Sequence, residues 1–157
     1  MGFDLSGVKP SSTKGEYFRN NVWWWHPLWD YVSHLCHKQL TPKQREHGHY
    51  NDGIKIPATK AAAIGNMLLE EIASGRTETY AMEYAAAMKN LEPEPCEICG
   101  GTGKRKQPPD VGPGTMPCNG CGGKGEREPF VTNYPFSVEN VKEFAEFCLE
   151  SGGVGIF

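Results

Sequence analysis

Apolar residues recur at helical spacing in four stretches of this chain, and each stretch predicts a helix. The first helix is expected to begin at His26-Pro27, because a proline at the first helical position removes no hydrogen bond. Its buried face is a stripe of Leu28, Val32, Leu35 and Cys36, with Trp25 and Trp29 beside it. The second helix follows Pro57 and ends at Gly75, with one face formed by Ala61, Ile64, Leu68 and Ile72.

The other two predicted helices lie on either side of a segment rich in glycine and proline. One spans about residues 77–90 and ends before Glu92-Pro-Glu-Pro95, because a residue that precedes proline avoids the helical conformation. The other begins at Ser137, a good N-cap, and ends at Gly152-Gly153. Residues 41–57 contain prolines and the sequence Asn51-Asp-Gly53, and they are predicted to form a turn-rich connection.

An eight-residue phrase occurs twice between the last two predicted helices. The copies run from Cys96 to Gly103 and from Cys118 to Gly125, and both read C-x-x-C-x-G-x-G. Two cysteines separated by two residues hold a metal ion from one turn, and two such turns complete a four-sulfur shell. The sequence therefore predicts one structural Zn²⁺ per chain, with the ligands Cys96, Cys99, Cys118 and Cys121. Two disulfides, or four free thiols, are the alternatives.

The zinc segment is predicted to be an insert in a single helical body. Residues 129–157 are too few to form a core of their own, so their helix must pack against the earlier helices. We expect residues 1–93 and 129–157 to form this body and residues 94–128 to form the zinc module. Phe3 to Val8 and Val154 to Phe157 are expected to pair as strands. The predicted fold class is α+β, mainly α: a helical body with a short terminal β pairing and an inserted zinc-knuckle module of β-hairpin type.

The repeated phrase is similar to the cysteine-rich zinc region of DnaJ-type co-chaperones, in which it occurs four times and forms two zinc sites. Residues 96–125 resemble half of that region, and the His-Pro-Asp tripeptide of a J-domain is lacking, because Leu28 follows His26-Pro27. The remainder resembles a family of small uncharacterised proteins of bacteria and their phages. The resemblance lies in Met1–Ser6, Gly15–Trp25, Tyr134–Asn140 and Ser151–Gly153. It implies a cytoplasmic, phage-linked setting and no particular activity.

Composition excludes some classes of protein. Apolar residues make up 38% of the chain, and no apolar run is long enough to predict a membrane span. No secretory leader is recognised, so we expect a reducing, cytoplasmic location in which cysteines bind metal. The formal net charge is −3, and a zinc ion held by four thiolates would make it about −5. That charge does not favour a general nucleic-acid coat.

The tryptophans are the first candidates for binding a partner. All four lie within residues 23–29, and four indoles so close in sequence are not expected to share one core. Core packing and a recognition surface are both consistent with this pattern. The loop between the knuckles adds a basic triplet that contacts a partner or offsets the charge of the zinc–thiolate cluster. The partner-binding candidates are Arg19, Trp23, Trp24, Trp25, Trp29, Lys104, Arg105 and Lys106.

A second group of residues has ligand chemistry but no recognised motif. The candidates for an open, hydrolytic metal site are His34, His37, His47, His49 and Asp52. No nucleophile elbow, P-loop or dinucleotide fingerprint is present in the sequence. We therefore predict a non-enzymatic, zinc-stapled binding or adaptor protein that docks a protein partner, as a phage-encoded accessory or host-interaction factor. A metal-dependent hydrolase and a nucleic-acid-binding zinc protein are the alternatives, and the sequence does not determine the oligomeric state.

Overall fold

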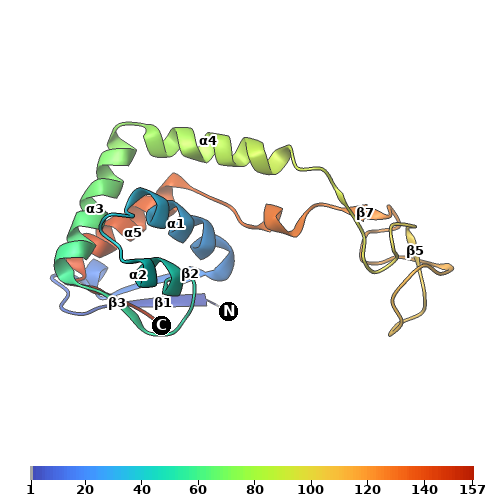
Figure 1. The fold of residues 1–157 in the computed structure, drawn as a ribbon, viewed down its shortest axis with the longest axis horizontal. Coiled ribbons are helices and arrows are strands. Elements are labelled where there is room, and N and C mark those ends of the chain that lie inside the picture. The colour runs from blue at the N-terminus through green and yellow to red at the C-terminus, as the bar shows by residue number, and fades with distance from the viewer. Residues whose placement is uncertain (1) are drawn as a thin grey trace. The chain divides into compact units, whose positions relative to one another are not determined.

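The computed structural model describes residues 2–157 and divides them into two compact units. The first unit comprises the chain up to Ala85 together with Tyr134–Phe157, and the second is Ala86–Asn133. About 45% of the chain is helical and a small antiparallel sheet accompanies the helices, which confirms the α+β, mainly α class (Figure 1). The narrower insert boundaries of 94 and 128 remain a prediction.

A four-stranded antiparallel sheet lies at the base of the first unit. Its strands are β1 (Gly2–Gly7), β2 (Tyr17–Asn21), β3 (Ile54–Ile56) and β8 (Val154–Ile156), in the order β2-β1-β8-β3. The register places Leu5 opposite Phe18 on one side and Ile156 on the other. The predicted pairing of the two ends of the chain is therefore confirmed. The strands β2 and β3 were not predicted from the sequence, because five and three residues are too few to establish a period.

Helix α1 (Val22–Leu35) begins earlier than the sequence predicts. The side chain of Asn21 caps the helix by accepting a hydrogen bond from the amide of Trp24, and the first helical residue, Val22, lies four residues before His26. The prediction of a start at His26-Pro27 was therefore wrong, and Pro27 lies buried inside the helix. The missing Pro27 amide removes one intrahelical hydrogen bond. Residues 22–25 therefore form the first turn of the helix.

A short helix also lies within the connection that was predicted to consist of turns. Helix α2 (Pro42–His47) is preceded by a capping box, in which Thr41 and Gln44 exchange side-chain and backbone hydrogen bonds. Proline at the first position and glutamine three residues after threonine are the sequence signature of such a start. The signal was present in the sequence, but six residues gave too little periodicity to reveal a helix. The short 3₁₀ turn η1 (Thr13–Gly15) precedes β2.

The core of the first unit is formed by the tryptophan segment and by α5 (Val138–Glu150). Trp25 and Trp29 are fully buried, and their rings stack with centroids 5.3 Å apart. Phe144 of α5 meets Trp25 edge-on at a centroid distance of 5.8 Å. Phe3 also stacks on Trp25, at a centroid distance of 5.2 Å. This aromatic cluster therefore joins α1, α5 and β1 in one core.

The remaining helices confirm three predictions. Helix α3 (Ala58–Ala73) ends before Gly75, α4 (Arg76–Lys89) spans the predicted third helix, and α5 is capped by Ser137. Helices α3 and α5 pack closely at Gly65, where a Cβ atom would lie 2.7 Å from Leu149 Cγ (Figure 1). In the part of α4 that belongs to the first unit, Thr77 is buried and its hydroxyl lies 3.0 Å from the Tyr31 hydroxyl.

The second unit is built around two pairs of very short strands. Strand β4 (Glu94–Pro95) pairs with β7 (Glu126–Arg127), and β5 (Lys104–Arg105) pairs with β6 (Met116–Pro117), both antiparallel. The 3₁₀ turn η2 (Phe130–Asn133) ends the unit. Within the described part of the chain, no helix is both long enough and apolar enough to cross a membrane.

Candidate metal centre

Four cysteine sulfurs converge in the second unit. The Sγ atoms of Cys96, Cys99, Cys118 and Cys121 all lie within 4.8 Å of one another. The Cys96–Cys118 and Cys99–Cys121 distances are 3.9 Å and 3.8 Å, well beyond a disulfide bond. Four sulfurs placed about 2.3 Å from a central zinc ion at tetrahedral angles are separated by about 3.8 Å. The spacing therefore fits a tetrahedral four-sulfur metal site.

The two knuckles repeat the same hydrogen-bond pattern. In each copy, the amide of the last glycine donates to the second cysteine sulfur, from Gly103 to Cys99 at 3.3 Å and from Gly125 to Cys121 at 3.2 Å. The knuckles also bond reciprocally, because each first cysteine amide donates to the last glycine carbonyl of the other copy, at 2.8 Å and 2.9 Å. The duplicated sequence therefore forms a pseudo-symmetric pair of knuckles, in which each knuckle donates a backbone hydrogen bond to the other.

The last glycine of each copy occupies a position that no other residue fits well. The backbone φ angle is +75° at Gly103 and +85° at Gly125, in the left-handed region that favours glycine. A Cβ atom on Gly103 would lie 2.3 Å from the carbonyl oxygen of Gly123. At Gly125 it would lie 2.4 Å from the carbonyl oxygen of Gly101. The final glycine of the motif is thus required for two reasons: the backbone has a positive φ angle there, and the two knuckles approach each other too closely for a side chain.

The electrostatic environment differs among the thiols. Burial raises the pKa of the Cys99 thiol, but the Gly103 amide and the neighbouring sulfurs outweigh burial and lower that pKa to about 7. At Cys118 burial dominates and raises the pKa to about 11. A metal ion must displace the protons that the thiols hold, so metal binding to this cluster is expected to release protons.

A buried arginine braces the loop between the knuckles. Arg105 donates to the side chain of Asn119 at 2.8 Å and to the backbone carbonyls of Lys106 and Asp110 at 3.1 Å and 3.3 Å. Its side chain therefore has a structural role and is only 9% exposed. Lys104 and Lys106, the other members of the basic triplet, are exposed.

The structure divides the tryptophan segment between core and surface. The buried indole N–H groups of Trp25 and Trp29 donate to the carbonyls of Gly48 and Arg45, at 2.8 Å and 2.9 Å. Trp24 is half-buried, and Trp23 is 37% exposed with its ring 5.1 Å from that of Tyr134. Arg19, the remaining partner-binding candidate of the first unit, is exposed and lies 3.7 Å from Asp4. Trp25 and Trp29 are thus core residues, which removes them from a docking surface.

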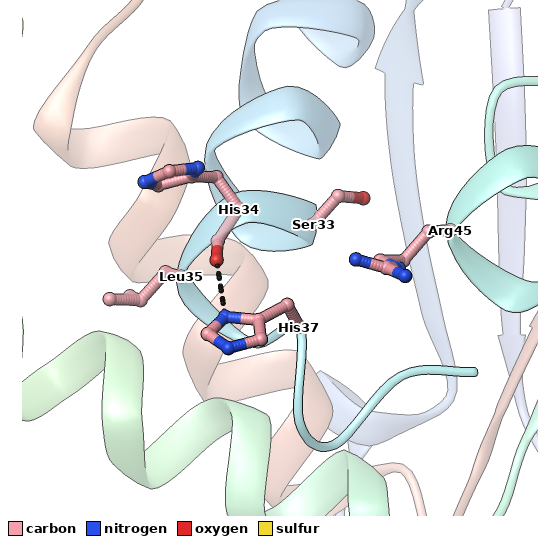
Figure 2. A pocket seen from close by; sticks show the side chains of 5 residues that line it. All are labelled: Ser33, His34, Leu35, His37 and Arg45. Carbon is pink, nitrogen blue, oxygen red and sulfur yellow. Dashed lines mark hydrogen bonds between the residues drawn. The ribbon is translucent and has the colours of Figure 1, made fainter. Parts of the chain in front are cut away.

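The histidine candidates for a second metal lie in separate places. His47 contacts Asp52, whereas His37 Nδ1 lies 3.0 Å from the backbone oxygen of His34 (Figure 2). Among residues 2–157, the four cysteines are the only group of three or more such side chains close enough to hold a metal ion. The structure therefore does not bring the five predicted hydrolytic residues together.

His34 and His37 line an open pocket of about 430 Å³ with Ser33, Leu35 and Arg45 (Figure 2). His34 lies in the last turn of α1 and Arg45 in the last turn of α2, where the positive charge of the arginine complements the helix dipole.

A different histidine pair was missed by the sequence reasoning. His26 Nδ1 lies 3.2 Å from His49 Nδ1, and His49 Nε2 lies 3.3 Å from a carboxylate oxygen of Asp30. His26 and Asp30 are four residues apart on α1, which places them on one helix face. That spacing was readable in the sequence, but the position of His49 depends on the fold of the loop after α2.

Comparison of the chain with models of known families found no match. Searches of curated proteins and of solved structures likewise found no match. The fold and the cysteine cluster therefore define the class by themselves: a mainly helical α+β protein with a possible four-cysteine metal-binding site.

Proposed function

We propose that this chain is a non-enzymatic binding protein stapled by one structural Zn²⁺, and that it docks a protein partner. The single observation that carries the proposal is the cluster of four buried sulfurs at tetrahedral spacing. Four thiolates suit a soft or borderline metal such as zinc, and a shell closed by four protein ligands leaves no position for a reacting water. Resemblance to the DnaJ-type zinc region supports the same metal.

The loop between the knuckles is the proposed docking element. It presents Lys104 and Lys106 together with two apolar side chains, Val111 at 61% and Met116 at 43% exposure. The hydrogen bonds of Arg105 to Asn119 and to the Asp110 carbonyl hold the loop in one conformation, so the loop is preorganised for a partner. A mixed basic and apolar surface of this kind suits an acidic protein segment with apolar anchors. The phage-encoded accessory role of the docking rests on the sequence resemblance.

The charge of the second unit supports a protein partner over nucleic acid. Its basic residues are Lys89, Lys104, Arg105, Lys106, Lys124 and Arg127, and its acidic residues are Glu92, Glu94, Glu97, Asp110, Glu126 and Glu128. The two sets balance, and a zinc ion with four thiolates adds net negative charge. Nucleic-acid binding ordinarily depends on a clear excess of basic residues.

Metal analysis tests the zinc part of the proposal. Protein purified without chelator should contain one zinc per chain, and Co²⁺ exchanged into the site should give the absorption of a tetrahedral all-sulfur complex. Cys99→Ser should lose the metal, whereas Cys36→Ser, at a buried cysteine outside the cluster, should retain it. A metal-free protein with four titratable thiols would contradict the zinc site, and a second bound metal would favour the hydrolase alternative.

Loop variants test the docking part. A partner captured by the wild type should bind a Val111→Ser, Lys106→Glu double variant at least about tenfold more weakly, a loss of about 1.4 kcal/mol. Lys89→Glu, an exposed change in the same unit, is the matched control and should bind normally. Equal binding by the double variant would exclude this loop as the docking element. Binding only to nucleic acid, with strong salt dependence, would favour the other alternative.

A further inference from the structure

Two half-buried histidines of the first unit, His26 and His49, contact each other through their ring nitrogens. The His26 and His49 rings are nearly parallel, at an interplanar angle of 21°, with centroids 5.5 Å apart and Nδ1 atoms 3.2 Å apart. The two ring centroids are farther apart than the two Nδ1 atoms by about twice the distance from an imidazole centroid to a ring atom. Both Nδ1 atoms therefore lie close to the line that joins the two centroids. The rings therefore meet edge to edge, in the geometry of a linear N–H···N hydrogen bond.

A carboxylate beside the pair favours one tautomer of His49. Asp30 Oδ1 lies 3.3 Å from His49 Nε2, and a carboxylate beside that nitrogen favours the tautomer with the proton on Nε2 and a free acceptor at Nδ1. His26 then donates from Nδ1 to His49 Nδ1. The contact holds one proton between the rings. When both imidazoles are cationic, both facing nitrogens carry protons, and the hydrogen bond becomes a repulsion.

The pair fastens a loop that covers the tryptophan core. His49 follows Gly48, whose carbonyl accepts from the indole of Trp25 at 2.8 Å. Gly48 also lies directly against Trp29, because a Cβ atom there would be 2.1 Å from that indole ring. Within the segment of residues 47–53, Gly48 thus packs against two fully buried tryptophans, and the link between His26 and His49 ties this segment to α1.

Aromatic side chains from two other segments also contact the pair. His26 meets Phe3 of β1 at 5.5 Å and Tyr134, just before α5, at 6.0 Å, both measured between ring centroids. On α1, Asp30 is the carboxylate that faces His49. Within residues 47–53, His47 contacts Asp52. Burial, and then the proximity of His49, lower the pKa of His26.

We propose that the His26–His49 pair is a pH-sensitive latch, which holds residues 47–53 over the tryptophans at neutral pH and releases them when both imidazoles are protonated. A group whose pKa is lowered by folding binds fewer protons in the closed state than in the open state. Its contribution to closure is therefore present above the ordinary histidine pKa of about 6.5 and declines as the pH falls below it.

Hydrogen exchange and tryptophan fluorescence of the full-length protein test the latch. Between pH 7.5 and pH 5, amides of residues 47–53 should exchange several-fold faster after correction for intrinsic rates, and the tryptophan emission should shift to the red. His49→Gln and His26→Gln should each remove most of this pH dependence. His34→Gln, an exposed histidine of α1 outside the pair, is the matched control and should keep it.

The wild-type protein alone also tests the proposal, so the test does not depend on stable variants. Imidazole ¹⁵N spectra at neutral pH should show His49 protonated on Nε2 and the two rings titrating as a coupled pair. Independent titrations, or unchanged protection of residues 47–53 at pH 5, would overturn the latch. The same loosening in His49→Gln as in the wild type would overturn it as well.

Discussion

At the scale of single residues, glycine and tryptophan have opposite roles in the two units. In the second unit, Gly103 and Gly125 let two backbones approach so closely that each last glycine accepts an amide from the opposite knuckle. In the first unit, Trp25 and Trp29 fill the core, and their N–H groups find backbone carbonyls. Glycine is required in the second unit because it has no side chain. Tryptophan suits the first unit because its large side chain fills the core and its single N–H donor finds a hydrogen-bond acceptor.

The glycines of the motif are not equivalent, and a pair of variants should show it. Gly103→Ala should weaken metal retention strongly, because its Cβ would lie 2.3 Å from the Gly123 carbonyl oxygen as well as having an unfavourable φ. Gly122→Ala is the matched control, since it has a φ of +58° but no atom within 4 Å of the added Cβ. It should cost only about 1–2 kcal/mol of backbone strain.

Competition with a chelator, followed for the wild type and both variants, measures this difference. The expected order of zinc retention is wild type, then Gly122→Ala, then Gly103→Ala. Equal retention by the two alanine variants would mean that φ strain alone decides the role of these glycines and that the close approach of the knuckles contributes nothing.

At the scale of elements, close approach of two helices determines the packing of the first unit. Gly65 on α3 lies against the backbone of α5, where an added Cβ would be 2.8 Å from the carbonyl oxygen of Ala145. The glycine weakens α3 as a helix by about 1 kcal/mol relative to alanine. Its presence inside a helix is therefore explained by packing, because a larger residue would force the two helices apart.

Gly65→Ala should lower the free energy of unfolding in spite of its better helix propensity. The gain of about 1 kcal/mol is opposed by an overpacking cost of about 1–3 kcal/mol, and the rigid backbone of α5 favours the upper part of that range. Asn66→Ala, at the exposed neighbouring position, should instead be neutral or slightly stabilising. Urea unfolding of both variants gives the two changes in the free energy of unfolding. A Gly65→Ala variant more stable than the wild type would show that α3 and α5 can move apart at little cost.

At the scale of the whole molecule, the two units are stabilised by different physical means. The first unit has an extensive apolar core, whereas the buried cluster of the second consists of the four cysteines, with Ile98 packed against it. A unit of this size without an apolar core depends on its metal for folding. The two units are therefore expected to respond differently to removal of metal.

Chelation should unfold the second unit and leave the first folded. Structural zinc sites contribute about 10–16 kcal/mol of apparent binding free energy at neutral pH, which no other interaction in the second unit replaces. Amides of residues 94–128 should lose protection from exchange, while those of α3 and α5 should retain it. Loss of protection throughout the chain would show that the units fold together, and unchanged protection of residues 94–128 would contradict the metal site.

The sequence determined the features that depend on local spacing. Helical periodicity and caps located α3, α4 and α5, and the doubled cysteine phrase identified all four members of the sulfur cluster. The sequence also indicates the start of α2 through the capping-box residues Thr41 and Gln44, although this short helix was not predicted.

Only the tertiary structure decided which of the remaining candidates meet. It buried Trp25 and Trp29 but left Trp23 partly exposed, and it separated His34 and His37 from the other histidines. It also paired His26 with His49, which are distant in sequence. Such contacts depend on how loops close and helices cross, and side-chain spacing along one chain segment carries no information about either.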